Sequence, residues 1–548
     1  MKVIYSALTV TFSFLFFFSF SFLTQRNELP RGPFGAESRI PASIIPKDIT
    51  NELLRFTSRV QSARFTLETC QGILQSEFSK LNSYRFTDFD LNAVKADAFS
   101  LSHQVFNTRM TLREKYLQLT RPFILQAQGQ IENLSSRDQG HFANCAWAFR
   151  RAFRGLRVLE DYLGEAATGF PFEREREKSG SLPAMLAFEG GPSYLQWNKK
   201  FHFPGDKYVP QSGDVILSRG TASTSAAIAR ISDEDTNFSH LSMVWVDPSG
   251  NPTSPKIETI ESHIEIGSDL FSWGSYVGDG KSRAVIFRFR DPSVSPEENA
   301  RVAHEAASKI RNLVAQHKVQ TGQRICYDFA MNMNDEKCIF CSEIIRIAFN
   351  KVGRPGVPFL PSPIQPKNRK FIQSIGVTAH VTFAPADIEL DPRFELVGEW
   401  RDHRRLHRTH FMDAVLTSMY RWMDDRNYEL RGSLLDKFAS YFGYSVRRIP
   451  VFSLPLQTKL PLNMKREAME SVIVLNTVVN RLTDYLDEEE KKLPGPRPQR
   501  FSPFEMEEAL EKFRAHDERL YREALEAGGG ALDPTSIHPH HFHSIFRN

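Results

Sequence analysis

The spacing of apolar residues divides the chain into two helical regions with a strand-rich region between them. From residue 48 to 165, apolar side chains recur at intervals of three and four, as in the stripe from Phe142 to Leu163. Such a stripe covers one face of a helix, so residues 48–165 are predicted to form an α-helical bundle. Helical spacing returns in residues 405–527 and stops at a Gly-Gly-Gly run. Residues 528–548 are expected to be a disordered tail.

Residues 205–400 follow a different pattern, in which short segments rich in β-branched or aromatic residues are bounded by Gly, Pro, Asp or Ser. Such segments are typical of strands. A Ser-Pro-Glu-Glu start predicts a helix from Ser295 to about His317, and a second helix is predicted to begin near Cys341. The expected strands are 214–218, 241–246, 256–260, 284–290 and a last one around 377–383.

These changes of period predict an α+β fold. We expect an antiparallel, barrel-like sheet beside the helix of Cys341, with helical regions on both sides of it in sequence. A chain of 548 residues with 41% hydrophobic positions can bury more than one core. Its formal charge is only +4, so no large basic surface points to nucleic acid as a partner.

Residues 3–23 form an uncharged run crowded with Phe, Leu and Ser. The run approaches the roughly 20 apolar residues that cross a bilayer as a helix, and it exceeds the roughly 7–15 of a signal-peptide core. A membrane anchor is therefore favoured over a cleaved signal segment, and the Pro-rich residues 24–47 are interpreted as a linker. Both interpretations predict that the remainder of the chain is exported to the periplasm or the cell exterior.

The chain has five cysteines, and in an exported protein the odd one suggests a reactive thiol. Cys341 is the best candidate, because Ile344, Ile345 and Phe349 continue an amphipathic helix that places it in the first turn. The N-terminus of a helix lowers the pKa of a thiol and offers N–H groups to an oxyanion.

A thiol nucleophile also needs a base within hydrogen-bond reach. His240 begins a predicted strand, from which an imidazole can project into a cleft. A carboxylate would orient that ring and hold its tautomer. Glu261, at the end of the next predicted strand, is the candidate, with Glu258 as the alternative.

The order of these residues resembles the permuted papain-like amidases of the YaeF/YiiX group, in which the histidine precedes the cysteine. The resemblance covers residues 209–400, and Ala384 departs from the simpler form of the closing element. The segments that carry it are Gly213-Asp214-Val215-Ile216-Leu217-Ser218, Phe238-Ser239-His240-Leu241-Ser242-Met243-Val244, Ile260-Glu261-Ser262, Tyr327-Asp328, Phe340-Cys341-Ser342-Glu343 and Phe383-Ala384-Pro385-Ala386-Asp387-Ile388.

The resemblance implies a circularly permuted papain-like domain in residues 205–400, with Cys341 as nucleophile, His240 as base and Glu261 as third member. Tyr327 is implied as a contributor to substrate binding, at the oxyanion hole or the cleft wall. The implied activity is that of a cysteine-dependent amidase, peptidase or thiol acyl hydrolase, without metal or cofactor, on a cell-envelope peptide or acyl lipid. The alternative is a catalytically inactive relative that binds a ligand or serves as a scaffold at the membrane.

Other interpretations of the cysteines stay open. Cys338 and Cys341 form a C-x-x-C near Cys326, which suggests a zinc or dithiol site, although no second pair follows. Pairing or burial of Cys326 and Cys338 is favoured. Cys70 and Cys145 fall on apolar stripes, so they are expected to be core residues or one interhelical disulfide.

Two further features carry weaker signals. Asn237-Phe238-Ser239 is a glycosylation sequon beside the predicted base, which suggests a bacterial protein or a shielded asparagine. The one dense basic cluster is expected to be a solvated helix face, with contact to anionic lipids as the alternative. It comprises Arg401, His403, Arg404, Arg405, His407, Arg408 and His410.

Overall fold

The computed structural model describes a large part of the chain, in two compact units. One unit comprises Ile40–Glu511 and Ile545–Asn548, and the other comprises Met1–Arg39 and Lys512–Ser544. The described residues are 49–82, 98–168, 195–201, 208–232, 236–250, 254–364, 369–432, 444, 464–493, 501, 503–527 and 542–547.

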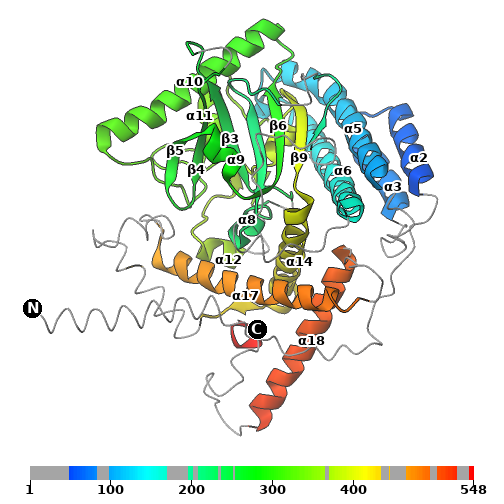
Figure 1. The fold of residues 1–548 in the computed structure, drawn as a ribbon. Coiled ribbons are helices and arrows are strands. Elements are labelled where there is room, and N and C mark those ends of the chain that lie inside the picture. The colour runs from blue at the N-terminus through cyan, green and yellow to red at the C-terminus, as the bar shows by residue number, and fades with distance from the viewer. Residues whose placement is uncertain are drawn as a thin grey trace, which may run out of the picture. The chain divides into compact units, whose positions relative to one another are not determined.

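The larger unit is built on a seven-stranded antiparallel sheet in the order β1-β9-β6-β2-β3-β4-β5 (Figure 1). Among the described residues the outer strands β1 and β5 do not pair with each other, so hydrogen bonds do not close this sheet into a barrel. The expected α+β class with an antiparallel sheet is confirmed. The strands are β1 (Leu195–Trp197), β2 (Val215–Gly220), β3 (His240–Val246), β4 (Ile257–His263), β5 (Gly267–Ser272), β6 (Lys281–Phe289) and β9 (Phe394–Arg401).

Four of the expected strands correspond to β2, β3, β4 and β6, but the fifth prediction is wrong in extent. Only Val381–Thr382 of the segment around 377–383 is a strand, β8, and it pairs with β7 (Ser362–Pro363) apart from the main sheet. The sheet instead receives β9, which pairs with both β6 and β1. No strand was expected at residues 394–401 from the sequence pattern.

Residues 49–168 are mostly helical where they are described, but the apolar stripe from Leu53 to Leu74 belongs to two helices, with a break at residues 63–69. The helices are α2 (Ile49–Ser62), α3 (Cys70–Asn82), α5 (Ala98–Gln126) and α6 (Ser136–Thr168). A disulfide between Cys70 and Cys145 joins α3 to α6. The apolar core of these helices also takes in Phe359 and Leu390, so the helices and the sheet region pack together in one unit.

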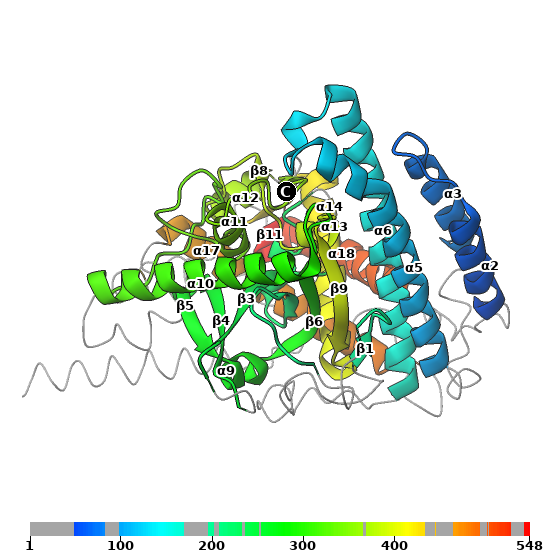
Figure 2. The same ribbon diagram turned by 90° about the horizontal axis from the view of Figure 1, so that it is seen from above.

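Helices α10 (Pro296–Thr321) and α11 (Glu343–Asn350) pack side by side against the sheet (Figure 2). The hydroxyl of Ser295 caps α10 as predicted, and Gly322 ends it in the left-handed conformation. Helix α10 contacts β3, β5 and β6, whereas α11 contacts β3 and β4. Shorter helices of this region are α8 (Ser223–Ile228), α9 (Trp273–Gly278), α12 (Arg369–Ser374) and α13 (Asp387–Leu390).

The chain becomes helical again directly after β9. Helix α14 (His403–Arg426) packs against α6, β6 and α17 (Arg466–Glu490), and α18 (Pro503–Ala527) begins where a proline at the first helical position predicts it. The tail differs from the expectation of disorder at its end, because β11 (Phe546–Arg547) pairs with β10 (Glu429–Leu430).

The basic cluster at the start of α14 is not a solvated face. Arg401 and His407 are both almost completely buried, and Arg401 Nη1 lies 2.7 Å from a carboxylate oxygen of Glu160. His407 bridges Glu165 and Glu490 at 2.9 and 2.8 Å. The expectation of solvent exposure is therefore wrong for these residues, because carboxylates from other helices neutralise them.

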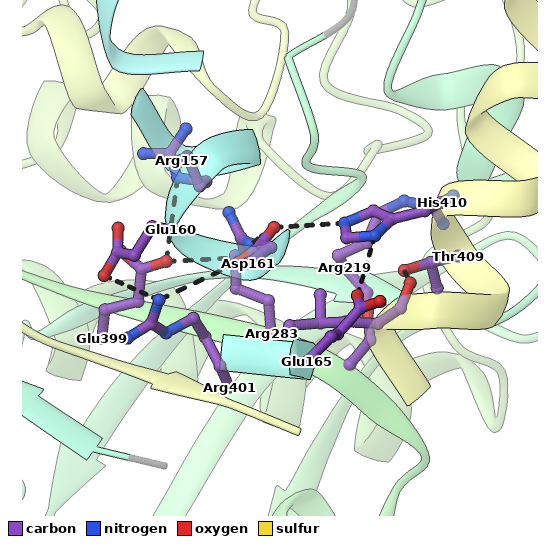
Figure 3. Close-up of polar contacts among 12 residues, drawn as sticks. Arg157, Glu160, Asp161, Glu165, Arg219, Arg283, Glu399, Arg401, Thr409 and His410 are labelled. Carbon is purple, nitrogen blue, oxygen red and sulfur yellow. Dashed lines mark hydrogen bonds and ion pairs between the residues drawn. The ribbon is translucent and has the colours of Figure 1, made fainter. Parts of the chain in front are cut away.

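These contacts belong to a buried ion network between α5, α6, β6, β9 and α14 (Figure 3). Glu399 of β9 lies near its centre, paired with Arg109 and with the side chains of Arg157 and Arg283 at 3.7 and 3.5 Å. His410 links Asp161 to Glu165 at 3.2 and 2.9 Å. The network ties the N-terminal helices to the sheet and to α14.

No helix within the described ranges is long and apolar enough to cross a membrane. The expected anchor at residues 3–23 and the linker at residues 24–47 lie outside those ranges.

Candidate active site

The predicted base and its carboxylate partner lie on neighbouring strands. His240 is the first residue of β3 and Glu261 the fifth of β4, and His240 Nε2 is 2.8 Å from Glu261 Oε2. The hydroxyl of Thr259 donates a hydrogen bond of 2.7 Å to the other carboxylate oxygen. Glu261 is only 2% exposed, so these donors compensate for the loss of water around its charge.

Glu258, the alternative partner, does not take this place. Side chains alternate between the two faces of a strand, so residues 258 and 261 point to opposite faces of β4. Glu258 pairs with Arg311 of α10 at 2.6 Å and with Lys256 at 2.8 Å. The structure therefore brings Glu261 rather than Glu258 to the His240 ring.

Cys341 approaches the same imidazole. The His240 ring and the backbone N–H of Leu241 both lie close enough to the Cys341 sulfur to lower the pKa of its thiol. Because Nε2 of His240 faces Glu261, the nitrogen left for the sulfur is Nδ1. The three residues expected to act together thus form one chain of contacts, from carboxylate to imidazole to thiol.

The position of Cys341 differs by a few residues from the prediction. It lies just before α11, whose N-cap is Ser342, rather than within the first helical turn. No backbone hydrogen bond found among the described residues uses the N–H of Cys341 or of Ser342 as donor. These two N–H groups are therefore available to an oxyanion formed at the sulfur.

The cysteines are paired so that Cys341 keeps its thiol. Cys326 and Cys338 form a disulfide, and all five cysteines lie in described segments, where Cys341 is the free one. Because Cys338 is in this disulfide, it is not available as a zinc ligand or as a dithiol partner of Cys341 in the C-x-x-C. The disulfide loop is held to β4 by the hydroxyl of Ser262, which donates to the carbonyl of Ile339 at 2.5 Å.

Tyr327 lies beside the thiol. Its hydroxyl is near the sulfur of Cys341, and its ring packs edge-on against Phe329 with centroids 5.2 Å apart. Burial raises the pKa of the Tyr327 hydroxyl well above its usual value, and negative charge on Cys341 adds to the shift. Tyr327 therefore stays protonated and can donate a hydrogen bond at the site.

The three groups shift one another's pKa values toward an ion pair. Burial raises the pKa of the Cys341 thiol, but hydrogen bonding and charge from His240 outweigh it, so that the pKa is lowered overall. Burial lowers the pKa of the His240 ring, but Cys341 and Glu261 together raise it to about 10. Despite burial, the hydrogen bond from His240 and the nearby His263 ring hold the pKa of Glu261 well below its usual value. These shifts favour a thiolate beside an imidazolium over the neutral pair, compared with the same groups free in water.

His263 is a member of this cluster that the sequence analysis missed. Its Nε2 lies 3.3 Å from Glu261 Oε2, and its ring centroid is 4.9 Å from that of His240. The signal was available, because residues two apart in a strand share a face and His263 follows Glu261 by two.

His240, Glu261 and His263 are also a candidate set of metal ligands, since their ligand atoms all lie within 4.8 Å of one another. Bonds of about 2 Å in a tetrahedral zinc site would hold neighbouring ligand atoms about 3.3 Å apart. The 2.8 Å between His240 and Glu261 is instead a hydrogen-bond distance. The geometry therefore favours a hydrogen-bonded pair over a preformed metal site.

The sequon beside the base is shielded. Asn237 is 9% exposed and has a positive φ of 63°, at the approach to β3. A glycan on this side chain would need the segment before His240 to unfold locally.

The fold and the site define an α+β protein with a buried Cys-His-Glu cluster on an antiparallel sheet. Comparison with family models, with curated proteins and with solved structures found no match to this chain.

Proposed function

We propose that the protein is a cysteine-dependent hydrolase of the permuted papain-like kind, acting through an acyl-thiol intermediate. The observation that carries the proposal is the contact chain from Glu261 through His240 to Cys341, formed by β4, β3 and the residue just before α11. A thiol that had only a packing role would gain nothing from an imidazole held by a buried carboxylate.

In the first step, the Cys341 thiolate attacks the carbonyl carbon of an amide, ester or thioester. A carbon–sulfur bond forms, and the negative charge that develops on the carbonyl oxygen is met by the N–H groups of Cys341 and Ser342. His240 then gives its Nδ1 proton to the leaving amine, alcohol or thiol as the bond to that group breaks.

In the second step, neutral His240 takes a proton from water, which attacks the thioester carbon. The carbon–sulfur bond breaks, the carboxylic acid leaves, and the thiolate–imidazolium pair is restored. Glu261 keeps the Nε2 proton on the ring through both steps, because its 2.8 Å contact fixes the tautomer.

The proposed substrate is a peptide or acyl lipid of the cell envelope, and the proposed location is outside the cytoplasm, held to the membrane through residues 3–23. The support is the motif order in residues 209–400 and the uncharged run near the N-terminus. The alternative function, a catalytically inactive ligand-binding or scaffold protein, retains the same three residues but requires an unreactive thiol.

The test is to trap the acyl-thiol on the full chain with p-nitrophenyl esters and aminoacyl p-nitroanilides of increasing acyl length. We expect a burst of p-nitrophenol or p-nitroaniline, together with a mass increase equal to the acyl group on the peptide that contains Cys341. Cys341→Ser should lose the mass increase, whereas Cys70 and Cys145 should carry none because they are disulfide-bonded.

The inactive alternative would be favoured if no acyl group appeared on Cys341 with any of these substrates. Iodoacetamide at pH 6 provides a second measurement, because it reports thiolate reactivity even when the natural acyl group is unknown. Slow and unselective labelling would count against the proposal.

A further inference from the structure

Glu261 has a second imidazole partner, His263, at the end of β4. The Nε2 atom of His263 is 3.3 Å from the same carboxylate oxygen that contacts His240. The contact has the distance of an ion pair but not the geometry of a hydrogen bond, and Nε2 of His263 is buried without a hydrogen-bond partner among the described residues. Contacts at catalytic sites often tighten only when substrate binds. His263 is 27% exposed, so it forms the outer side of the cluster.

The rings of His240 and Phe271 pack against the His263 imidazole. Its centroid lies 4.9 Å from that of His240 with a 35° angle between the planes, and 5.0 Å from that of Phe271 in an edge-on contact. The strand pairing of His263 with Gly267 fixes its backbone at the turn between β4 and β5. The side chain is therefore directed at Glu261 by its surroundings.

During the proposed reaction the Glu261 carboxylate loses part of the stabilisation that it receives from His240, so a second positive partner is needed to hold its charge. One of its oxygens receives the Thr259 hydroxyl, and the other depends on His240 and His263. In the proposed reaction His240 loses and regains its Nδ1 proton. While the ring is neutral, its electrostatic attraction for the Glu261 carboxylate is weaker. A buried carboxylate left with too few donors is costly, and it would move or take up a proton.

We propose that His263 is a positioning residue that holds Glu261 ionised and in place, so that His240 keeps its orientation toward Cys341 throughout the reaction. This role rests on the proposed function. His263 itself does not touch the reacting atoms.

The test compares two replacements in the full chain. His263→Phe keeps an aromatic ring beside His240 and Phe271 but removes the N–H, whereas His263→Gln keeps an N–H donor without the ring. His317→Gln on α10 is the matched control, since the structure shows no side-chain contact between His317 and the cluster. The rate of iodoacetamide labelling of Cys341 is measured from pH 5 to 9, with the melting temperature of each variant and with EDTA or ZnCl₂ added.

We expect His263→Phe to lower the labelling rate at pH 6 by about tenfold and to move the profile to higher pH, by analogy with the outer partners of metal-bound histidines, whose loss costs about 10- to 100-fold. His263→Gln should recover most of the rate, and His317→Gln should match the wild type. Acyl transfer to Cys341 should fall in the same order.

The proposal is overturned if His263→Phe matches the wild-type profile, or if the Phe and Gln variants lose rate equally, because then the N–H donor does not matter. It is also overturned if EDTA changes the wild-type rate and His263→Phe removes that effect, because the three residues would then be a metal site. Failure of the proposed function looks different: wild-type Cys341 would itself be labelled like an ordinary thiol.

Discussion

Burial raises the pKa of a thiol, and Cys341 is only 3% exposed. Its pKa is nevertheless lowered, because an imidazolium and a backbone N–H are aimed at the sulfur. The pKa of His240 is raised to about 10 by the same contact and by Glu261. At the scale of single residues, the site is therefore a mutual stabilisation of opposite charges in a place that water hardly reaches.

The pH dependence of labelling follows from these shifts. The rate depends on the fraction of thiolate, and the pKa of Cys341 is lowered, so the wild type should lose less of its rate between pH 9 and pH 6 than an ordinary thiol does. In His240→Ala the thiol loses the cation that lowers its pKa. With an ordinary thiol pKa of about 8.5, only about 0.3% of the thiol is ionised at pH 6, so the rate should be lower than that of the wild type there and rise about tenfold per pH unit.

Iodoacetamide labelling of Cys341, followed by mass spectrometry, measures both profiles. Cys338→Ser in the same assay is a control for the neighbouring disulfide, and it should leave the wild-type profile unchanged. A wild-type rate that climbs through pH 8.5 would contradict the ion pair.

At the scale of elements, the turn between β4 and β5 decides how the site is assembled. Gly267 has φ +78°, and a Cβ on it would lie 2.1 Å from the carbonyl oxygen of Ile325. The N–H of Ser268 donates to that same carbonyl at 2.8 Å. The hairpin that carries Glu261 and His263 is thereby held against the segment that leads to Tyr327.

Gly267→Ala should separate these two segments. Gly322→Ala is the matched control, because Gly322 also has a positive φ, +69°, but a Cβ there meets nothing within 4 Å. The left-handed conformation alone costs about 1–2 kcal/mol for alanine. The clash should destabilise Gly267→Ala by about 2 kcal/mol more, as overpacking typically does.

Urea unfolding of the two variants measures the difference in the free energy of unfolding. Labelling of Cys341 should slow in Gly267→Ala and stay normal in Gly322→Ala. Equal behaviour of the two variants would show that the close approach at Ile325 does not matter.

At the scale of the larger unit, buried ion pairs join the N-terminal helices to the sheet, a role that apolar contacts usually have. Glu399 on β9 is completely buried, and it faces Arg109 of α5, Arg157 of α6 and Arg283 of β6. Burial opposes the charge of Glu399, but these arginines together lower its pKa. Removing one member leaves the others buried without compensation.

Glu399→Gln should therefore destabilise the protein by about 3–5 kcal/mol at pH 7. Arg301→Ala, which breaks an exposed pair with Glu298 on α10, should have a much smaller effect. Because the folded-state pKa of Glu399 is lowered, its contribution is present above the unfolded value of about 4.3 and is lost as the pH falls below it.

Urea unfolding at pH 7 and at pH 4 measures both effects. The gap between wild type and Glu399→Gln should narrow at the lower pH. A gap that stayed constant would mean that the pKa of Glu399 is the same in the folded and unfolded states, and a gap that widened would mean that folding raises it.

Local periodicity determined most helices and four strands of the sheet, because each depends on residues close in sequence. The order of short motifs also pointed to His240, Glu261 and Cys341, which the fold brings into contact. The same reasoning failed for β9, since a strand between β6 and β1 is buried by partners more than a hundred residues away in sequence.

The charged cluster at the start of α14 shows the same limit. Sequence alone predicts that a run of Arg and His faces water, because burying such groups is costly. Only the tertiary structure brings Glu160, Glu165 and Glu490 against Arg401 and His407, which makes burial possible.

The sequence by itself determined the α+β class and the residue types available for thiol chemistry. The tertiary structure decided which carboxylate holds His240, which cysteine stays free and that His263 joins the cluster. The physical reason is that residue type and spacing act along the chain, whereas pKa values, disulfide pairing and hydrogen bonds depend on distances between segments that only folding brings together.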